Sequence, residues 1–180
     1  FDTRGDAVLA AADAECVRHQ GRHGVIAAGA WSAPLGSALG VELPVRAKKR
    51  DVFVVESPAV LPHCPLVIDP GGVWLRPEGP FFITGTKPRA SDPGSGAESG
   101  ADSDPDDAPL DAIDHALFDN IIWPALAARI PAFEALRVRS AWAGYYEVNT
   151  FDHNALIGAL PGWRNAVCVC GFSGHGMQHA

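Results

Sequence analysis

The sequence predicts an α+β fold, in which a mostly antiparallel sheet is covered by one helix and a further strand ends in a glycine-rich loop. Three observations predict it. Short apolar runs starting at Cys64, Val73 and Phe81 are separated by Gly and Pro turns, as in an antiparallel sheet. Apolar residues recur at helical spacing over residues 113–130, and residues 167–170 form a short apolar run directly before the glycines.

The N-terminal part is predicted to be a small antiparallel meander that feeds a buried strand. Residues 7–20 contain two strand-like runs, and residues 23–32 form a third, in which Val25 and Ile26 are expected to be core residues. Residues 27–30 carry almost no side chain. Such small residues suit either close packing of a helix on the sheet or the approach of a bulky ligand, and both interpretations stay open.

The middle of the chain supplies the sheet and its covering helix. Residues 34–40 predict a short helix and residues 51–56 a buried strand. The helix over residues 110–130 should break or kink at Pro124, and residues 137–148 are the longest predicted strand. Four basic residues at the entry of the strand over residues 51–56 form either a solvated surface or a clamp for a carboxylate or phosphate. They are Arg46, Lys48, Lys49 and Arg50.

An acidic, low-complexity segment precedes that helix. Residues 88–109 contain no large apolar residue, so we expect a disordered loop that cannot offset its ordering entropy. The formal net charge of −7 arises in this region, since removing eight nearby acidic residues leaves +1 for the rest of the chain. The eight are Asp92, Glu98, Asp102, Asp104, Asp106, Asp107, Asp111 and Asp114. A near-neutral body without interleaved basic and aromatic residues argues against nucleic acid as a partner.

Cysteine usage and hydropathy bear on the compartment. Cys16, Cys64, Cys168 and Cys170 have no framework spacing, which predicts free buried thiols in a reducing, cytoplasmic compartment. No apolar run approaches the roughly 18 residues of a membrane span. The chain starts without Met or a signal segment and stops within the first turn of a helix, so we expect a fragment of a longer protein.

The glycine loop GFSGHGMQ, residues 171–178, follows a strand and starts a helix, which predicts a cradle of N–H groups for negative charge. Zinc is one candidate ligand, because Cys168, Cys170, His175 and His179 crowd together. Their spacing matches no zinc finger or ribbon, so no metal site is predicted.

Two other chemistries fit the same loop. The pattern G-x-S-x-G around Ser173 is typical of a hydrolase nucleophile, but too little chain follows to supply the acid and the His that this order requires. A flavin is the second, because N–H groups beside its pyrimidine edge would stabilise the charge that develops on reduction.

Four segments in this order resemble the D-amino-acid oxidase and sarcosine oxidase superfamily of FAD-dependent oxidoreductases. They are VIAAGAWS at 25–32, ELPVRAKKR at 42–50, WAGYYEVNTFDHN at 142–154 and GFSGHGMQ at 171–178. The resemblance covers nearly the whole chain apart from the acidic loop. The WAGYY and NTFD segments are most similar to the branch linked to assembly of respiratory complex I.

The resemblance implies FAD, and it implies two sets of cofactor-binding residues. At the strand end these are Ala28, Gly29, Ala30 and Trp31, and at the loop they are Gly171, Phe172, Ser173, Gly174, His175, Gly176 and Met177. The sheet over residues 52–146 would be the substrate domain, where a C–H bond beside an amine delivers hydride to the flavin. Tyr145, Tyr146, Lys49 and Arg50 are the implied catalytic candidates, which would shape or charge the substrate pocket.

Departures from the family pattern refine these expectations. No cysteine lies in residues 142–146, where related oxidases attach flavin covalently, so FAD should be non-covalent. Ile83 stands near a lysine that helps oxygen react, which favours dehydrogenation with another acceptor. Gln178 replaces a carboxylate-binding lysine, so amine and amino-acid substrates both stay open. No G-x-G-x-x-G fingerprint is present, which implies that the N-terminal part of a Rossmann-like FAD-binding domain is missing.

We therefore expect three ranges. Residues 1–45 are part of the FAD-binding domain, residues 46–148 are the substrate domain with its loop at 88–109, and residues 149–180 return to the FAD-binding domain. The expected function is oxidation of the C–N bond of an amine or amino acid, with the isolated fragment inactive. The alternatives are a scaffold or assembly factor with structural FAD and, third, a Ser173 hydrolase. The implied partners are the substrate and an electron acceptor or respiratory complex, with a peripheral position at the inner membrane as a second option for location.

Overall fold

The computed structural model describes residues 1–86 and 109–179, so the predicted disordered loop over residues 88–109 lies, except for Pro109, outside the described residues. The chain divides into two compact units. Unit 1 comprises Phe1–Lys48 and Tyr146–Ala180, and unit 2 comprises Lys49–Tyr145. The boundaries fall inside two long strands, β5 (Val45–Glu56) and β9 (Arg137–Asn149). The functional roles expected for the three ranges stay predictions.

The two strand-like runs predicted over residues 7–20 are confirmed in unit 1 as β2 (Ala7–Ala12) and β3 (Arg18–Gln20), and the third strand of their sheet is β1 (Asp2–Arg4). The three strands form an antiparallel sheet in the order β1-β2-β3. Asp13 organises the turn between β2 and β3, because its Oδ1 accepts hydrogen bonds from the N–H groups of Glu15 and Val17 at 3.0 and 2.9 Å.

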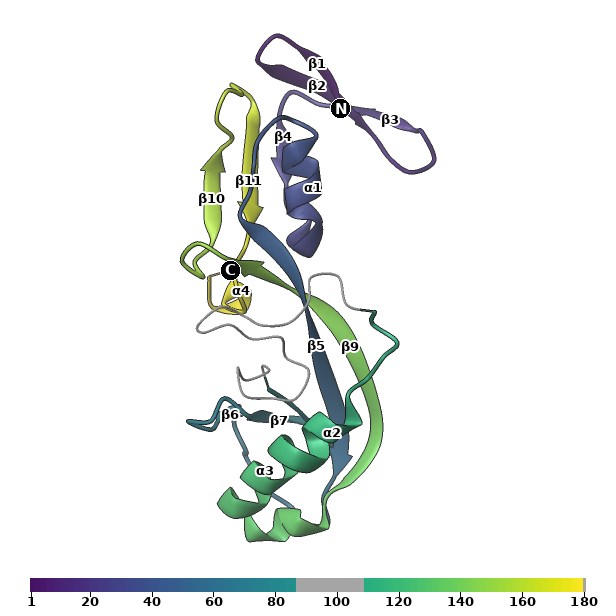
Figure 1. Cartoon of the computed structure of the whole chain (residues 1–180), viewed down its shortest axis with the longest axis vertical. Helices are drawn as coiled ribbons and strands as arrows, with labels where there is room; N and C mark the ends of the chain where they lie inside the picture. The colour runs from purple at the N-terminus through teal and green to yellow at the C-terminus, as the bar shows by residue number, and fades with distance from the viewer. Residues whose placement is uncertain (87–108, 180) are drawn as a thin grey trace. The chain divides into compact units, whose positions relative to one another are not determined.

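A second sheet of unit 1 contains the strand that the meander feeds. β4 (Gly24–Ile26) pairs in parallel with β11 (Ala166–Cys170), which pairs antiparallel with β10 (Leu156–Ala159), as Figure 1 shows. The predicted third run is thus a strand only as far as Ile26. It continues in the 3-10 turn η1 (Gly29–Trp31) and the short helix α1 (Ser32–Ser37).

The core of unit 1 corrects one prediction. Val25 is 60% exposed, because alternation along β4 turns it away from the buried Ile26. The buried residues come from both ends of the chain and pack in one cluster. They are Val8, Ile26, Leu39, Leu43, Val45, Leu160, Ala166, Cys168 and Cys170.

The predicted antiparallel sheet forms in unit 2. Its strands have the order β6-β7-β8-β5-β9. The three not yet defined are β6 (Val67–Ile68), β7 (Trp74–Glu78) and β8 (Phe81–Gly85). β5 is twice as long as the predicted strand, because it also includes the basic cluster. Lys48 and Asp51 are buried in it along with the apolar residues.

The covering helix is irregular where sequence patterns predicted a break. It runs through α2 (His115–Leu117), the π-helical turn η2 (Phe118–Ile122) and α3 (Trp123–Arg129). Pro124 stands in the first turn of α3, where its missing N–H costs little, so the irregularity is the π turn just before it. Asp114 caps the start of α2 by accepting from the N–H groups of Ala116 and Leu117 at 3.0 and 3.3 Å.

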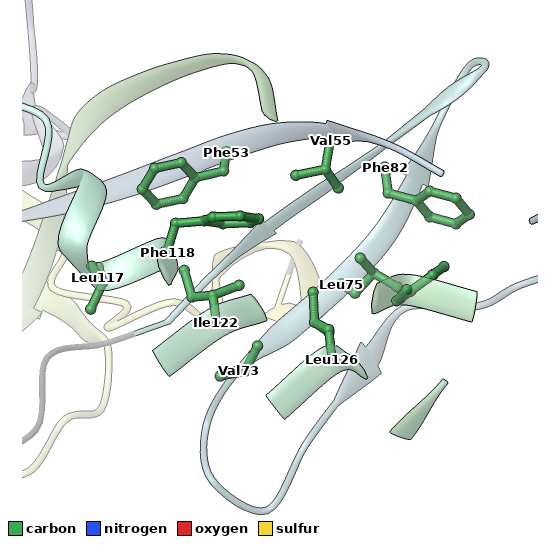
Figure 2. Packing of buried hydrophobic residues seen from close by; sticks show 10 residues of the cluster. Phe53, Val55, Val73, Leu75, Phe82, Leu117, Phe118, Ile122 and Leu126 are labelled. Atoms are coloured by element: carbon green, nitrogen blue, oxygen red, sulfur yellow. The ribbon is translucent and has the colours of Figure 1, made fainter. Parts of the chain in front are cut away.

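The helix covers one face of this sheet. Figure 2 shows Phe53 and Val55 of β5 facing Phe118, Ile122 and Leu126 of the helix. The rings of Phe53 and Phe118 lie 5.2 Å apart between centroids. Burying each such side chain contributes about 1.5–3 kcal/mol, so the contact between helix and sheet stabilises unit 2.

Candidate functional site

Two strand ends meet at one edge of the sheet in unit 1. β4 and β11 are parallel, with Ile26 beside Cys168, so the segments that follow them leave the sheet at the same edge. Those segments contain the two predicted cofactor-binding sets, 28–31 and 171–177. In open sheets with parallel strands, ligands bind at the carboxyl ends of the strands. The structure therefore brings the two predicted sets together at an edge suited to a ligand.

The loop after β11 needs glycine at two positions. Gly171 has φ +70° and Gly174 has φ +90°, in the left-handed region that side chains disfavour. A Cβ on Gly171 would meet Val45 Cγ2 at 3.2 Å, and one on Gly174 would come within 1.7 Å of the Tyr146 hydroxyl. The glycines let the loop backbone lie directly against β9.

Ser173 is held inside the loop. It is buried, with φ 49°, and its Oγ accepts from the N–H of Asn149 at 2.9 Å and donates to the carbonyl of Gly171 at 3.2 Å. Backbone groups therefore use the hydroxyl both as acceptor and as donor, and they stabilise the left-handed conformation. A nucleophilic serine is activated by a base that accepts its hydroxyl proton. The hydroxyl of Ser173 instead directs its proton to the Gly171 carbonyl.

The end of β9 holds the loop through consecutive residues. The Tyr146 hydroxyl donates to the Ser173 carbonyl at 2.7 Å. The Glu147 carbonyl accepts from the Ser173 N–H at 3.1 Å, and Glu147 Oε2 accepts from the Gly171 N–H at 2.8 Å. Tyr146 therefore positions the loop backbone, whereas its expected catalytic role stays a prediction.

Glu147 was not among the predicted site residues. Its contact with Gly171 spans 24 residues of sequence, so no local pattern reveals this contact. One signal was present, because Glu147 is the only acidic residue of the strand Arg137–Asn149.

The NTFD segment builds the turn that presents Asn149 to the loop. Asn149 is 1% exposed, and its Nδ2 donates to Asp152 Oδ1 at 2.8 Å and to the Asn154 carbonyl at 2.6 Å. Its Oδ1 accepts from the Phe151 N–H at 3.0 Å. The buried amide is thus fully paired. Two stretches of the resemblance, WAGYYEVNTFD and GFSGHG, contact each other directly through the bond between Asn149 and Ser173.

The predicted cradle of loop N–H groups is only partly available. Gly171 and Ser173 donate their N–H groups to Glu147, His175 donates to the Phe172 carbonyl at 2.9 Å, and Gln178 donates to the His175 carbonyl at 3.0 Å. Within residues 1–86 and 109–179, the remaining loop N–H groups make no hydrogen bond. They belong to Phe172, Gly174, Gly176 and Met177. A ligand at this edge would therefore meet these four donors and a carboxylate beside them.

The same edge has a further left-handed glycine and exposed apolar groups. Gly29 has φ +54°, and in the part of the chain that the structure describes a Cβ there would meet only Glu147 Oε2, at 4.0 Å. Trp31 is 61% and Met177 90% exposed. A flat, partly apolar group with hydrogen-bond acceptors along one side fits these residues, and the isoalloxazine ring of FAD is such a group.

The cysteines do not contribute a metal site. Cys168 and Cys170 point into the core of unit 1, and burial raises the pKa of the Cys170 thiol to about 11 although the Ser32 hydroxyl opposes this shift. In the described part of the chain, no three His, Cys, Asp or Glu side chains are grouped to hold a metal ion. All four cysteines are free, but Cys16 is exposed and Cys64 half-buried, so the prediction of buried thiols holds only for the other two.

The remaining catalytic candidates lie in unit 2. Lys49 Nζ lies 3.4 Å from Oδ1 of the buried Asp51 and donates to the carbonyl of Ala112. Arg50 Nη1 donates to the Lys49 carbonyl at 2.7 Å, and Tyr145 is half-buried on β9. The positive charge of Lys49 is thus engaged within unit 2, and the expected role of these residues in catalysis stays a prediction.

Solved structures share this fold. L-Proline dehydrogenase from P. horikoshii superposes with a TM-score of 0.76 at 19% identity, covering 98% of this chain and 44% of that one. Glycine oxidase from Geobacillus kaustophilus gives 0.66 at 20% identity, covering 86% and 37%. Among the helices of residues 1–86 and 109–179, none has both the length and the apolar composition of a membrane-spanning segment.

Curated proteins with similar sequences are FAD-dependent oxidoreductase domain proteins by name. FAD-dependent oxidoreductase domain-containing protein 1 of Xenopus laevis is 40% identical over 168 residues, which are 86% of this chain and 31% of the relative. The protein of the same name from Mus musculus is 39% identical over 170 residues, covering 86% and 32%. The chain thus spans about a third of the length of these curated relatives. A family model described as FAD dependent oxidoreductase (DAO) matches residues 2–180, and the chain therefore belongs to this FAD-dependent family.

Proposed function

We propose that this chain holds the flavin end of a non-covalently bound FAD, in a protein that oxidises the C–N bond of an amine or amino acid. The observation that carries the proposal is the edge formed by the ends of β4 and β11. There, among the described residues, a Cβ on Gly29 would contact only Glu147 Oε2, at 4.0 Å, and four loop N–H groups have no partner.

The chain's own groups suit this cofactor. Ala28, Gly29, Ala30 and Trp31 would contact FAD from the end of β4. The N–H groups of Phe172, Gly174, Gly176 and Met177 would donate to the oxygen and nitrogen atoms of its pyrimidine edge. Bound FAD supplies the two-electron acceptor for a hydride from the carbon beside the amine nitrogen. The loop's part is to fix these donors before reduction, which the bonds from Tyr146, Glu147 and Asn149 to the loop accomplish.

The substrate class is supported by fold likeness and by residue types. The similar structures include an L-proline dehydrogenase, a glycine oxidase and an L-amino acid deaminase. Arg50, Tyr145 and Tyr146 remain candidates for contacts with an amine or amino acid. Lys49 is a weaker candidate, since Asp51 already neutralises its charge. Ile83 of β8 stands near the position where the resemblance implies a lysine that helps oxygen react, and this absence of the lysine supports an electron acceptor other than oxygen.

One experiment separates the readings. The full-length protein is purified and its visible absorbance is recorded, then an N-methyl amino acid and a panel of amino acids are added without oxygen. An oxidoreductase carries the oxidised flavin band and loses it with one of these substrates. A flavin band that no amine bleaches would instead indicate the scaffold with structural FAD, and absence of flavin would overturn the proposal.

A second measurement addresses the hydrolase alternative. A fluorophosphonate probe labels activated serines, and the hydrogen bonds of Ser173 predict no labelling there. Labelling of Ser173 in the native protein, lost on denaturation, would instead favour a hydrolase.

A further inference from the structure

We propose that Glu147 is a positioning residue for the flavin loop, whose carboxylate fixes the first N–H of the loop and places a negative charge beside the cofactor. This inference rests on the proposed position of FAD at the ends of β4 and β11. It assigns a role to a residue that was not among the predicted site residues.

The geometry puts one carboxylate oxygen between the two strand ends. Glu147 Oε2 accepts from the Gly171 N–H at 2.8 Å, at the point where the chain turns out of β11 with φ +70°. Apart from the chain neighbours of Gly29, the same oxygen is the single atom of the described residues within 4 Å of a Cβ built on Gly29, at 4.0 Å. The carboxylate therefore lies at the start of one cofactor segment and faces the other.

The rest of Glu147 is fixed by the same loop. Its carbonyl accepts from the Ser173 N–H, and its neighbours in β9 bind the loop through the Tyr146 hydroxyl and the Asn149 N–H. The side chain is half-buried. A carboxylate held in this way keeps its orientation, and a hydrogen bond to a charged acceptor is stronger than one to a neutral acceptor.

The charge has a predictable direction of effect. The negative charge of Glu147 already reaches Cys170, where it adds to the burial that raises the pKa of that thiol. Reduction adds negative charge to a flavin, so a nearby carboxylate disfavours the reduced form and lowers the reduction potential. The unpartnered N–H groups of Gly174 and Met177 act in the opposite sense. Glu147 thus limits how strongly the loop stabilises reduced flavin.

Two substitutions in the full-length protein separate the hydrogen bond from the charge. Glu147→Gln keeps an acceptor for the Gly171 N–H and removes the charge. It should retain FAD with a dissociation constant within about threefold of the wild type while shifting the reduction equilibrium about tenfold toward reduced flavin, about 30 mV for a two-electron couple. Glu147→Ala removes both, and FAD should bind about tenfold more weakly, or about 1.4 kcal/mol. Glu15→Gln, on the exposed hairpin of unit 1, is the control and should change neither quantity.

The outcomes distinguish this inference from the proposed function. A wild-type protein without FAD overturns the placement of the cofactor and the inference with it. A wild type that holds FAD, together with an E147Q potential equal to that of the wild type, overturns the inference alone. The potential of E147Q decides the matter even if E147A does not fold, because a purely structural glutamate would leave the potential unchanged.

Discussion

Gly174 offers the sharpest test of the loop geometry. Replacing it by Ala introduces a methyl group that would lie 1.7 Å from the Tyr146 hydroxyl and 2.6 Å from Tyr146 Cζ. Neither separation is possible, so the phenol must move and its 2.7 Å hydrogen bond to the Ser173 carbonyl must break. The backbone also stays at φ +90°, which Ala tolerates poorly.

The magnitude follows from these two terms. A left-handed backbone with a Cβ costs about 1–2 kcal/mol, and the lost hydrogen bond about 1 kcal/mol. We therefore expect Gly174→Ala to lower the free energy of unfolding by about 2–3 kcal/mol. Gly162→Ala is the matched control, because Gly162 has φ +81° and no atom of the described residues lies within 4 Å of its Cβ position. It should lose only the backbone term, about 1–2 kcal/mol.

The assay is denaturant unfolding of the purified full-length protein, with midpoints compared at equal slope. FAD retained after gel filtration is measured in parallel. Gly174→Ala should lose more stability and more FAD than Gly162→Ala. Equal losses of stability in the two variants would refute the close contact between Tyr146 and the loop.

Two further predictions concern buried ionisable groups. Lys49→Met leaves the Asp51 carboxylate, 7% exposed, without its cation and should lower the free energy of unfolding by about 3 kcal/mol. Arg164→Ala, which removes an exposed ion pair with Asp6, should lower it by less than about 1 kcal/mol, and equal losses on denaturation would contradict the structural role of Lys49. Burial raises the pKa of Cys170 from 9.0 to about 11. The contribution of this thiol to the free energy of unfolding should therefore be fully present below pH 9 and be lost as the pH rises toward 11. Cys170→Ala should flatten this decline in unfolding experiments across that range, and an unchanged slope would contradict it.

Local patterns predicted most strands because the period-2 and turn signals are short-range. The strand at Arg137–Asn149, the meander and the glycine loop appear where those signals put them. The length of β5 could not be predicted, since its first half contains Arg46–Arg50 and its burial depends on pairing with distant strands. The prediction that Val25 is a core residue was wrong for a related reason, because hydropathy alone does not say which side of a strand faces the core.

Part of the candidate site could also be predicted from the sequence, and part could not. Glycines at strand ends are visible in sequence, and the parallel pairing of β4 with β11 brings them to one edge. The bonds that shape the loop join Tyr146, Glu147 and Asn149 to residues 24 to 27 positions away, so only the folded chain reveals them. These bonds also reduce the number of N–H groups that the loop can offer an anion. Glu147 accepts hydrogen bonds from two of them, the N–H groups of Gly171 and Ser173.

The measurement that tests the central claim most directly is amide hydrogen exchange of the full-length protein with and without FAD. If the cofactor binds at the ends of β4 and β11, peptides covering Gly24–Trp31 and residues 171–177 should both gain protection. A peptide covering β6 and β7 of unit 2 serves as the reference and should change less. Binding of FAD without protection of either segment would contradict the claim that this edge holds the flavin.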